Sequence, residues 1–280
     1  MWSMAWLPGI APNSRSKPLT TPLRVFITGA SSGIGAALAR HYAARGAVLG
    51  LAARRGETLE ALAAGLPVTC HLYSLDVTDA PALAVAASDF IARAGVPDIV
   101  IANAGVSVGT LTEAVEDLPA FRRVFDTNVL GMLHTFQPFV ASMKQAGAGR
   151  LVGIASVAGI RGLPGAGAYS ASKAAAIAYL ESLRVELRGS GVKVVTLAPG
   201  YIATPMTAKN PYPMPFLMPV DRAVQSMANH IERGSRFAVM PWQMSIVAGL
   251  LKLLPRPLFD ALFARAGRKP RGLDLQLPPP

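Results

Sequence analysis

The segment "RVFITGASSGIG", residues 24–35, places a glycine-rich turn between an apolar run and the helix-like sequence "AALARHYAARG". Glycine allows a sharp backbone bend, and it lets a ligand approach where a Cβ would block it. The following helix presents unpaired N–H groups and a positive dipole end, which suit a pyrophosphate. We interpret Gly29 as the bend, and Gly33 and Gly35 as sites of close approach. An ordinary turn remains an alternative, because the spacing differs from the more familiar Gly-x-Gly-x-x-Gly.

Short apolar runs alternate with segments of helical spacing along most of the chain. The apolar runs are nearly continuous, which suits a parallel sheet covered by helices on both faces. We therefore predict an α/β fold, one doubly wound domain of the Rossmann type with a parallel sheet of about seven strands. The predicted strands are Arg24–Thr28, Ala47–Ala53, Val68–Tyr73, Asp98–Ala102, Arg150–Ala155, Val192–Ala198 and Arg236–Met240, and the predicted helices include Gly35–Ala44, Ala80–Arg93, Phe121–Ala146, Tyr169–Leu187 and Asp221–Ile231.

The ends of the chain differ in composition from its centre. We predict a flexible lead-in over residues 1–22, a dinucleotide-binding and catalytic domain over 23–241, and a helical extension over 242–280 with a frayed tail. The extension holds two apolar helical patterns, which we expect Pro255 and Pro257 to break. Basic residues flank its apolar faces, so it could lie in a membrane interface. Packing on the domain or on a second subunit is the alternative that we favour.

Composition limits the classes of function. The chain of 280 residues has a net charge of +11, but its basic residues are dispersed and no nucleic-acid-binding signature is present. We expect no nucleic-acid partner. Cys70 is the single cysteine and the four histidines have no metal-ligand spacing, so we predict no disulfide, no metal site and a reducing, cytoplasmic compartment. No apolar run reaches the length of a membrane span.

Two arginines, Arg54 and Arg55, follow the second predicted strand. Dinucleotide folds read the adenosine ribose at this position, where an acidic residue binds the 2′-hydroxyl of NAD. A guanidinium instead suits a 2′-phosphate. The sequence therefore favours NADP(H), with NAD(H) left open. Two solvated arginines on a loop are the alternative.

Tyr169 and Lys173 lie four residues apart on a predicted helix, so they share one face. A tyrosine has an ordinary pKa near 10, and a neighbouring ammonium favours its ionised form. Ser156 ends a predicted strand and could bind the same substrate oxygen as the tyrosine. The Tyr-x-x-x-Lys spacing also arises by chance. Tyr179, in the same helix without a lysine four residues on, is an internal control.

The motifs together resemble those of the short-chain dehydrogenase/reductase family. They are "TGASSGIG", "NAG" at 103–105, "TNVLG" around Asn128, Ser156, "YSASK" and "PGYIAT" at 199–204, and they occur in the family's order. The resemblance covers roughly Leu23 to Met240. One departure is the turn itself, because some NADP-preferring members carry a basic residue where this chain has "ASS" at 30–32. Binding of a 2′-phosphate would then depend on Arg54, Arg55 and Ser31.

The resemblance implies a role for each matching residue. Tyr169 would protonate the substrate oxygen as hydride arrives, while Ser156 would hold the carbonyl. Lys173 would bind the nicotinamide ribose and lower the pKa of the tyrosine, and Asn128 would anchor a water linked to a proton relay. Asp76 would lie at the adenine. The implied cofactor-binding residues are Gly29, Ser31, Ser32, Gly33, Ile34, Gly35, Arg54, Arg55, Asp76, Val77, Asn103, Ala104, Gly105, Tyr169, Lys173, Pro199, Gly200, Ile202 and Thr204.

The substrate is less clearly indicated. Residues 203–219, "ATPMTAKNPYPMPFLMP", predict either a lid over an apolar substrate or a packed loop. The turn at 160–167 could form the opposite wall, with Arg161 either solvated or an anchor for an anion. We predict NADPH-dependent reduction of an apolar ketone or aldehyde. The alternatives are an NAD-dependent alcohol dehydrogenase of the same family, a non-catalytic NADP(H)-binding sensor and a peripheral membrane protein. The resemblance also implies a homodimer or homotetramer, assembled through helices 121–146 and 169–187.

Overall fold

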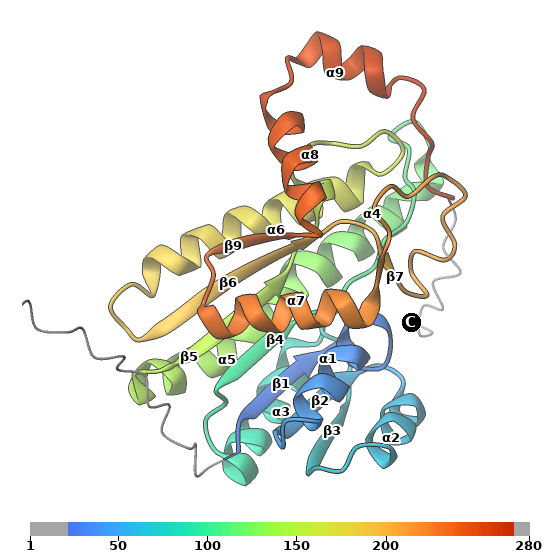
Figure 1. Cartoon of the computed structure of the whole chain (residues 1–280). Helices are drawn as coiled ribbons and strands as arrows, with labels where there is room; N and C mark the ends of the chain where they lie inside the picture. Colours follow the sequence, from blue (N-terminus) through green and yellow to red (C-terminus); the bar gives the residue numbers. More distant parts are fainter. Residues whose placement is uncertain (1–21, 272–280) are drawn as a thin grey trace, which may run out of the picture.

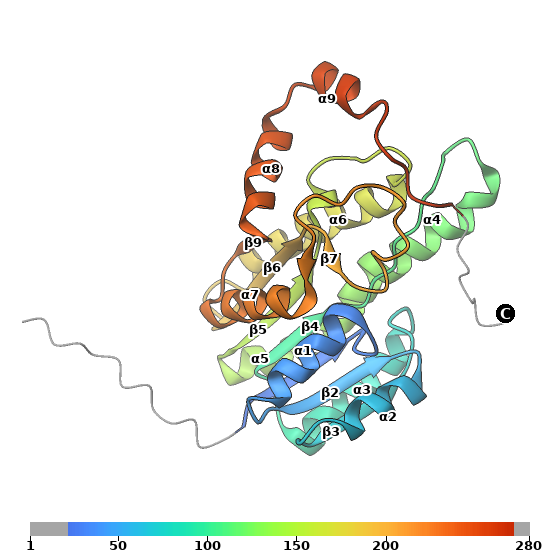
Figure 2. The ribbon, with the colours of Figure 1, turned by 45° about the vertical axis from the view of Figure 1, so that its right-hand side comes forward.

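One parallel sheet organises the molecule (Figure 1, Figure 2). The computed structural model describes residues 22–271, so the predicted lead-in up to residue 21 and the tail after residue 271 lie outside the described residues. The strand order is β3-β2-β1-β4-β5-β6-β9, which confirms the doubly wound α/β fold. The strands are β1 (Arg24–Thr28), β2 (Val48–Ala53), β3 (Cys70–Ser74), β4 (Ile99–Ala102), β5 (Gly149–Ile154), β6 (Val192–Pro199) and β9 (Phe237–Met240).

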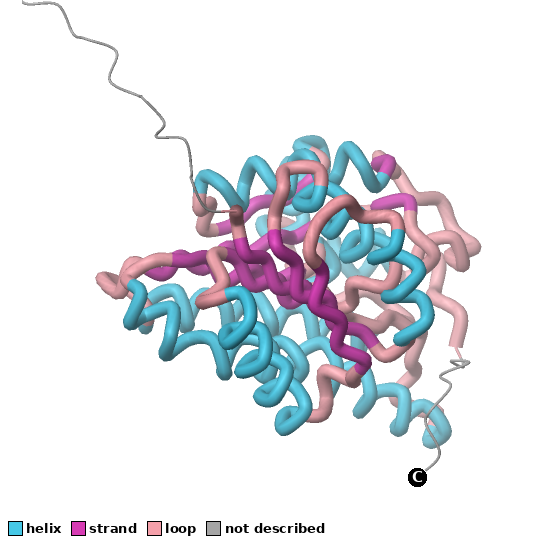
Figure 3. Tube along the Cα trace, turned by 90° about the horizontal axis from the view of Figure 1, so that it is seen from below, coloured by secondary structure: helices cyan, strands magenta, loops and turns pink. Residues whose placement is uncertain are grey.

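Helices cover both faces of the sheet (Figure 3). The strands are therefore buried on two sides, which explains their continuous apolar sequences. In one of the two cores the fully buried ring of Phe26 contacts Phe90 and Phe139, with centroid distances of 5.5 and 4.9 Å. One face carries α1 (Gly33–Ala43), α2 (Gly56–Ala64) and α7 (Val220–Arg233), and the other carries α3 (Ala80–Ala94), α5 (Gly131–Ala146) and α6 (Gly167–Glu186).

Two helical segments differ from the sequence prediction. No element was assigned to the residues that form α2, a short helix in which only Leu59 is fully buried, so its apolar periodicity is weak. The single helix predicted over 121–146 is divided. It consists of α4 (Leu118–Phe125), a π-helical turn at Asp126–Leu130, and α5. The wider turn matters because it carries Asn128.

The C-terminal extension forms an arch beyond the edge of the sheet (Figure 2). Its helices are α8 (Trp242–Leu253) and α9 (Arg256–Phe263), after which the chain returns toward α4 and α6. Pro257 does not break the second pattern, because it lies in the first turn of α9, where proline is tolerated. Among the described helices, none is long and apolar enough to cross a membrane. Shorter elements are the 3₁₀ turns Val115–Asp117 and Val157–Gly159, and the paired strands β7 (Ile202–Ala203) and β8 (Met218–Pro219).

Candidate active site

The glycine turn between β1 and α1 is shaped by three glycines with different tasks. Gly29 and Gly33 have φ angles of 66° and 53°, a region that favours glycine. A Cβ at Gly29 would lie 2.7 Å from the Cα of Ala104, and one at Gly35 would overlap the Gly29 carbonyl oxygen. These two glycines therefore pack the turn. At Gly33 an added Cβ would meet no overlap and would lie in ordinary contact with Thr204, 3.4 Å away.

Asn103 fastens the end of β4 to this turn. Its Nδ2 donates to the carbonyl oxygens of Thr28 and Gly29, each at 3.1 Å, and its backbone N–H donates to Thr28 Oγ1 at 3.3 Å. Asn103, expected beside a cofactor, thus also holds the backbone of the glycine turn with its side chain. β1 and β4 are adjacent strands whose following helices lie on opposite faces, the position where open α/β sheets bind ligands.

A cleft of about 300 Å³ lies at the carboxyl ends of the strands. Its lining contains every residue proposed from the sequence except Gly35 and Asn128, which are not among the lining residues. The structure thus brings together residues from the ends of six strands, β1 to β6. Arg123 and Thr127 also line the cleft, although the sequence analysis missed both. The proposed residues in the lining are Gly29, Ser31, Ser32, Gly33, Ile34, Arg54, Arg55, Asp76, Val77, Asn103, Ala104, Gly105, Ser156, Tyr169, Lys173, Pro199, Gly200, Ile202 and Thr204.

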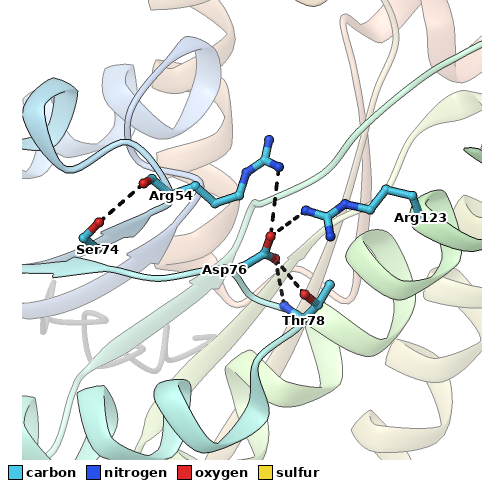
Figure 4. A network of polar contacts seen from close by, with 5 residues as sticks. All are labelled: Arg54, Ser74, Asp76, Thr78 and Arg123. Carbon is cyan, nitrogen blue, oxygen red and sulfur yellow. Dashed lines mark hydrogen bonds and ion pairs between the residues drawn. The ribbon is translucent and has the colours of Figure 1, made fainter. Parts of the chain in front are cut away.

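The two arginines after β2 lie at one end of the cleft. Both are exposed, and Arg55 donates to Ser31 Oγ at 3.2 Å, which ties it to the glycine turn. An Nη atom of Arg54 lies 4.0 Å from a carboxylate oxygen of Asp76 (Figure 4). The arginines directly precede Gly56, the first residue of α2. This unpredicted helix therefore adds its positive end to the two guanidinium groups.

Asp76 is held by a network that the sequence did not reveal (Figure 4). It accepts hydrogen bonds from the backbone N–H and the hydroxyl of Thr78, both at 3.0 Å, and from the Arg123 guanidinium. Burial alone raises the pKa of the Asp76 carboxyl, but these hydrogen bonds outweigh it and the net pKa is lowered. The buried Nε of Arg123 has no partner in the described part of the chain, so a donor remains beside the cleft.

The predicted tyrosine, lysine and serine meet at the other end of the cleft. Tyr169 and Lys173 lie one turn apart on α6, with Lys173 Nζ 5.9 Å from the centre of the Tyr169 ring. Lys173 is buried and donates to the carbonyl oxygen of Ile154 at 2.8 Å. Ser156 follows β5 and accepts from the backbone N–H of Ala158 at 3.1 Å. All three functional groups therefore face a common space.

Burial dominates the pKa values of Tyr169 and Lys173, and the expected lowering of the tyrosine pKa by the lysine stays a prediction. Burial raises the pKa of Tyr169, and a hydrogen bond with Ser156 only partly offsets the effect. Burial also lowers the pKa of Lys173 to about 8, with a smaller contribution from the charge of Lys269. The pKa of Tyr169 therefore stays above its ordinary value, with burial as the dominant cause. The phenol carries its proton at neutral pH, as a proton donor must.

Asn128 occupies the π-helical turn and is buried. Its Oδ1 accepts from the backbone N–H of Val106 at 2.8 Å, while its Nδ2 donates to the carbonyl of Val106 and to Ser172 Oγ, each at 3.0 Å. The side chain thus joins the loop after β4 to α6. It positions the helix that carries Tyr169, and its suggested role as a water anchor stays a prediction.

A second cavity, of about 360 Å³ and mostly apolar, shares Ser156 and Tyr169 with the cleft. Residues of the 160–167 turn and of the 203–219 segment line it, as the sequence analysis suggested for these two walls. The C-terminal arch supplies a third wall that was not foreseen. The arch contributes Met244, Val247, Leu251 and Phe263.

Arg161 has a different task from the anion anchor considered above. Its Nη1 donates to the carbonyl oxygens of Leu251 and Leu254, both at 2.9 Å, at the end of α8. Its guanidinium also lies 4.2 Å from the centre of the Phe259 ring. A cation at the carbonyl end of a helix is favourable. Arg161 therefore holds the arch over the second cavity.

Comparison with known proteins extends these observations. The sequence model of the short chain dehydrogenase family matches residues 24–213. An uncharacterized oxidoreductase of Myxococcus xanthus (strain DK1622) is 43% identical over 242 residues, covering 85% of this chain and 95% of the relative. The 2-dehydro-3-deoxy-L-rhamnonate dehydrogenase (NAD(+)) of Sphingomonas sp. (strain SKA58) is 38% identical over 185 residues, covering 66% and 74%.

Solved structures agree with the sequence matches. A short-chain dehydrogenase from Streptomyces avermitilis superposes with a TM-score of 0.71 and 28% identity, covering 83% of this chain and 96% of that one. The alcohol dehydrogenase from Thermococcus sibiricus complexed with 5-hydroxy-NADP gives a TM-score of 0.69 and 28% identity, covering 78% and 95%. The chain therefore belongs to the short-chain dehydrogenase/reductase family of oxidoreductases.

Proposed function

We propose that this protein reduces an apolar ketone or aldehyde with NADPH. The observation that carries the proposal is the meeting of two spaces at Tyr169 and Ser156. A cleft lined by the glycine turn and the two arginines reaches them from one side, and a mostly apolar cavity reaches them from the other. A dinucleotide in the first space and a carbonyl compound in the second would have their reactive ends at the same phenol.

The residues of the cleft fit a dinucleotide with a 2′-phosphate. Arg54, Arg55 and the start of α2 supply positive charge at the ribose end, and no acidic residue ends β2. The buried Thr127 hydroxyl lacks a partner among the described residues, as does Arg123 Nε, so polar groups remain for a ligand. Family membership does not choose the nucleotide, because the Sphingomonas relative is named for NAD(+) and the Thermococcus structure holds an NADP analogue.

The chemistry follows from the protonation of the three side chains. A bound nicotinamide would supply hydride to the carbonyl carbon. Tyr169 donates its proton to the carbonyl oxygen, and its pKa keeps it protonated until then. Ser156 holds the same oxygen through its hydroxyl. Lys173, one helical turn from Tyr169, returns a proton to the phenolate that results, since burial lowers the pKa of its ammonium to about 8.

Titration of NADPH and NADH into the purified protein tests the nucleotide. We expect NADPH to bind at least about tenfold more tightly, since a guanidinium–phosphate pair is a strong charge-assisted contact. Arg54→Ala and Arg55→Ala should each weaken the binding of NADPH but not the binding of NADH. Arg188→Ala, at an exposed arginine after α6, is the matched control and should change neither affinity. Equal affinities for the two nucleotides would contradict the preference for NADPH and favour the NAD-dependent alternative.

An NADPH-consumption screen over aldehydes and ketones, graded by chain length and charge, tests the reaction. We expect turnover to rise with apolar chain length until the second cavity is filled. Tight NADPH binding without turnover of any compound would favour the non-catalytic sensor. Turnover only in the direction of alcohol oxidation with NAD would favour the dehydrogenase.

The predicted membrane or subunit contacts stay open. Leu250, Leu253 and Leu262 on the arch are exposed, as are Leu133 on α5 and Val185 on α6. Flotation of the full chain with liposomes, compared with a chain ending near residue 241, tests the membrane contact of the arch. Equal flotation of the two proteins would exclude a membrane contact through the arch. Sedimentation of the same proteins tests assembly into the predicted dimer or tetramer.

A further inference from the structure

Residues 264–271, the C-terminal strap, return from the arch to the second cavity and bring a lysine to the proposed proton donor. Lys269 Nζ lies 4.5 Å from the centre of the Tyr169 ring. The same nitrogen donates to Ser107 Oγ in the loop after β4. Lys269 lines the second cavity but is absent from the lining of the dinucleotide cleft. Lys269 therefore faces the space proposed for the substrate.

The strap is held in place on both sides of this lysine. The backbone N–H of Gly109 donates to the carbonyl of Pro270 at 2.9 Å, and an added Cβ at Gly109 would overlap the Lys269 carbonyl oxygen. Arg271 pairs with Asp117 at 2.9 Å and with Glu116 at 2.8 Å. These contacts hold the backbone on either side of Lys269 against the loop after β4 and the turn before α4.

Lys269 has no carboxylate partner within the described residues. The two acidic side chains of this region, Asp117 and Glu116, are both used by Arg271. The lysine is partly buried, and the loss of water around its ammonium lowers its pKa to about 8. An ammonium against apolar walls is unfavourable unless an anion compensates it. The protein supplies the Ser107 hydroxyl and the face of the Tyr169 ring, neither of which is an anion, and the lysine also lines the cavity.

We propose that Lys269 binds an anionic group of the substrate, so that the protein selects carbonyl compounds with a carboxylate near the carbonyl and an apolar remainder. The inference rests on the proposed function, in which the Tyr169 hydroxyl marks the position of the carbonyl oxygen. The ammonium lies against the ring that carries this hydroxyl, so the carboxylate and the carbonyl are separated by only a few bonds. A 2-oxo acid with an apolar chain meets both requirements.

A matched pair of substrates tests the selection. In 2-oxo-4-phenylbutanoate the carbonyl bears a carboxylate, and in 4-phenylbutan-2-one a methyl group replaces it. We expect Lys269→Met to lower the ratio of kcat/KM for acid over ketone by about 10- to 100-fold, the range for loss of a charged hydrogen bond. Methionine keeps the unbranched chain of lysine up to the position of Cε and removes its ammonium. Lys252→Met, at an exposed lysine on α8, should leave the ratio unchanged.

Binding of an unreactive acid separates this inference from the proposed function. Calorimetry with 4-phenylbutanoate should show tighter binding to the native protein than to the Lys269→Met variant, with 4-phenylbutan-1-ol as the neutral control. If no carbonyl compound reacts but the acid still binds more tightly to the native protein than to the variant, the proposed reductase activity is contradicted and the proposed anion site is supported. If both carbonyl compounds react and the variant keeps the native ratio, the reductase stands and the anion site is overturned. Failure of both acids to bind overturns it as well.

Discussion

The dinucleotide cleft and the second cavity meet at Tyr169, but they are built in opposite ways. The cleft uses short segments that directly follow strands, such as the glycine turn at 29–35 and the arginines after β2. The second cavity uses three segments from distant parts of the chain, at 160–167, 203–219 and 242–269. Backbone geometry therefore determines the first space, and side chains on connecting segments determine the second. Substitutions should therefore affect the two spaces separately. We expect the cleft to be sensitive to changes in backbone geometry and the second cavity to be sensitive to changes in side chains.

The largest effect is expected where the two spaces meet. Tyr169→Phe removes the proposed proton donor without changing the ring, so turnover should fall by about a thousandfold or more. NADPH affinity should stay nearly unchanged, because the phenol acts on the carbonyl oxygen. Tyr179→Phe, on the same helix, is the matched control. A variant at Tyr169 that kept most of its turnover would remove this residue from the mechanism.

A pair of glycine substitutions tests the contrast between backbone and side chain. Gly35→Ala places a methyl group onto the Gly29 carbonyl oxygen, and we expect a loss of about 2–4 kcal/mol in the free energy of unfolding together with weaker NADPH binding. Gly249→Ala, in α8, meets open space and should instead raise stability by about 0.5–1 kcal/mol. Urea unfolding of both variants measures these changes. Equal changes in the free energy of unfolding of the two variants would contradict the proposed difference between the glycine turn and the arch.

The same contrast explains how far the sequence could be interpreted. The sheet, the glycine turn and the Tyr169–Lys173 pair were predictable because each depends on periodicity or on residues close in sequence. Helix α2 was missed because it buries little apolar surface, and the division at Asn128 because a π-helical turn has no residue signature. An element was therefore predictable only where its own local sequence contains the pattern that its structure depends on.

Contacts between distant residues could not be predicted from one sequence. Lys269 lies one hundred residues after Tyr169, in a basic run that has the composition of a solvated tail. Its place beside the ring depends on the arch, on the strap and on Arg161 capping α8. Arg161 is a second example of a contact that the sequence could not predict. Its guanidinium suits an anion, but its partners in the structure are two backbone carbonyls. Composition states what a side chain can bind, and the fold decides which group it meets.

Release of the strap should alter the second cavity and spare the cleft. Arg271→Ala removes both ion pairs with Asp117 and Glu116. We expect KM for the carbonyl substrate to rise by about tenfold, in keeping with loss of charged hydrogen bonds, and the NADPH dissociation constant to stay constant. Arg265→Ala, an exposed arginine of the same strap, is the control. An unchanged KM would show that Pro270 and Gly109 hold the strap without Arg271.

The smallest expected effect concerns the cost of the Lys269 charge. Its folded-state pKa of about 8 lies below the ordinary lysine value of about 10.4. Below pH 8 both the folded and the unfolded chain are protonated, so the penalty for the partly buried charge is fully present. Between pH 8 and 10.4 the unfolded chain binds more protons, and stability therefore rises with pH.

Lys269→Met removes this penalty at every pH. The variant should be more stable than the native protein at pH 7, and about 1 kcal/mol of that advantage should disappear by pH 10, after allowance for partial solvent screening. The other groups facing the ammonium are Tyr169, Lys173 and Ser107. The charge of Lys269 lowers the pKa of Lys173, so its removal also eases the burial of the Lys173 ammonium and adds to the stability of the variant at pH 7. Urea unfolding without nucleotide at the two pH values measures the difference. A stability difference that does not change with pH would mean that the Lys269 ammonium stays hydrated in the folded protein. A hydrated ammonium would argue against Lys269 as the binding site for an anionic substrate.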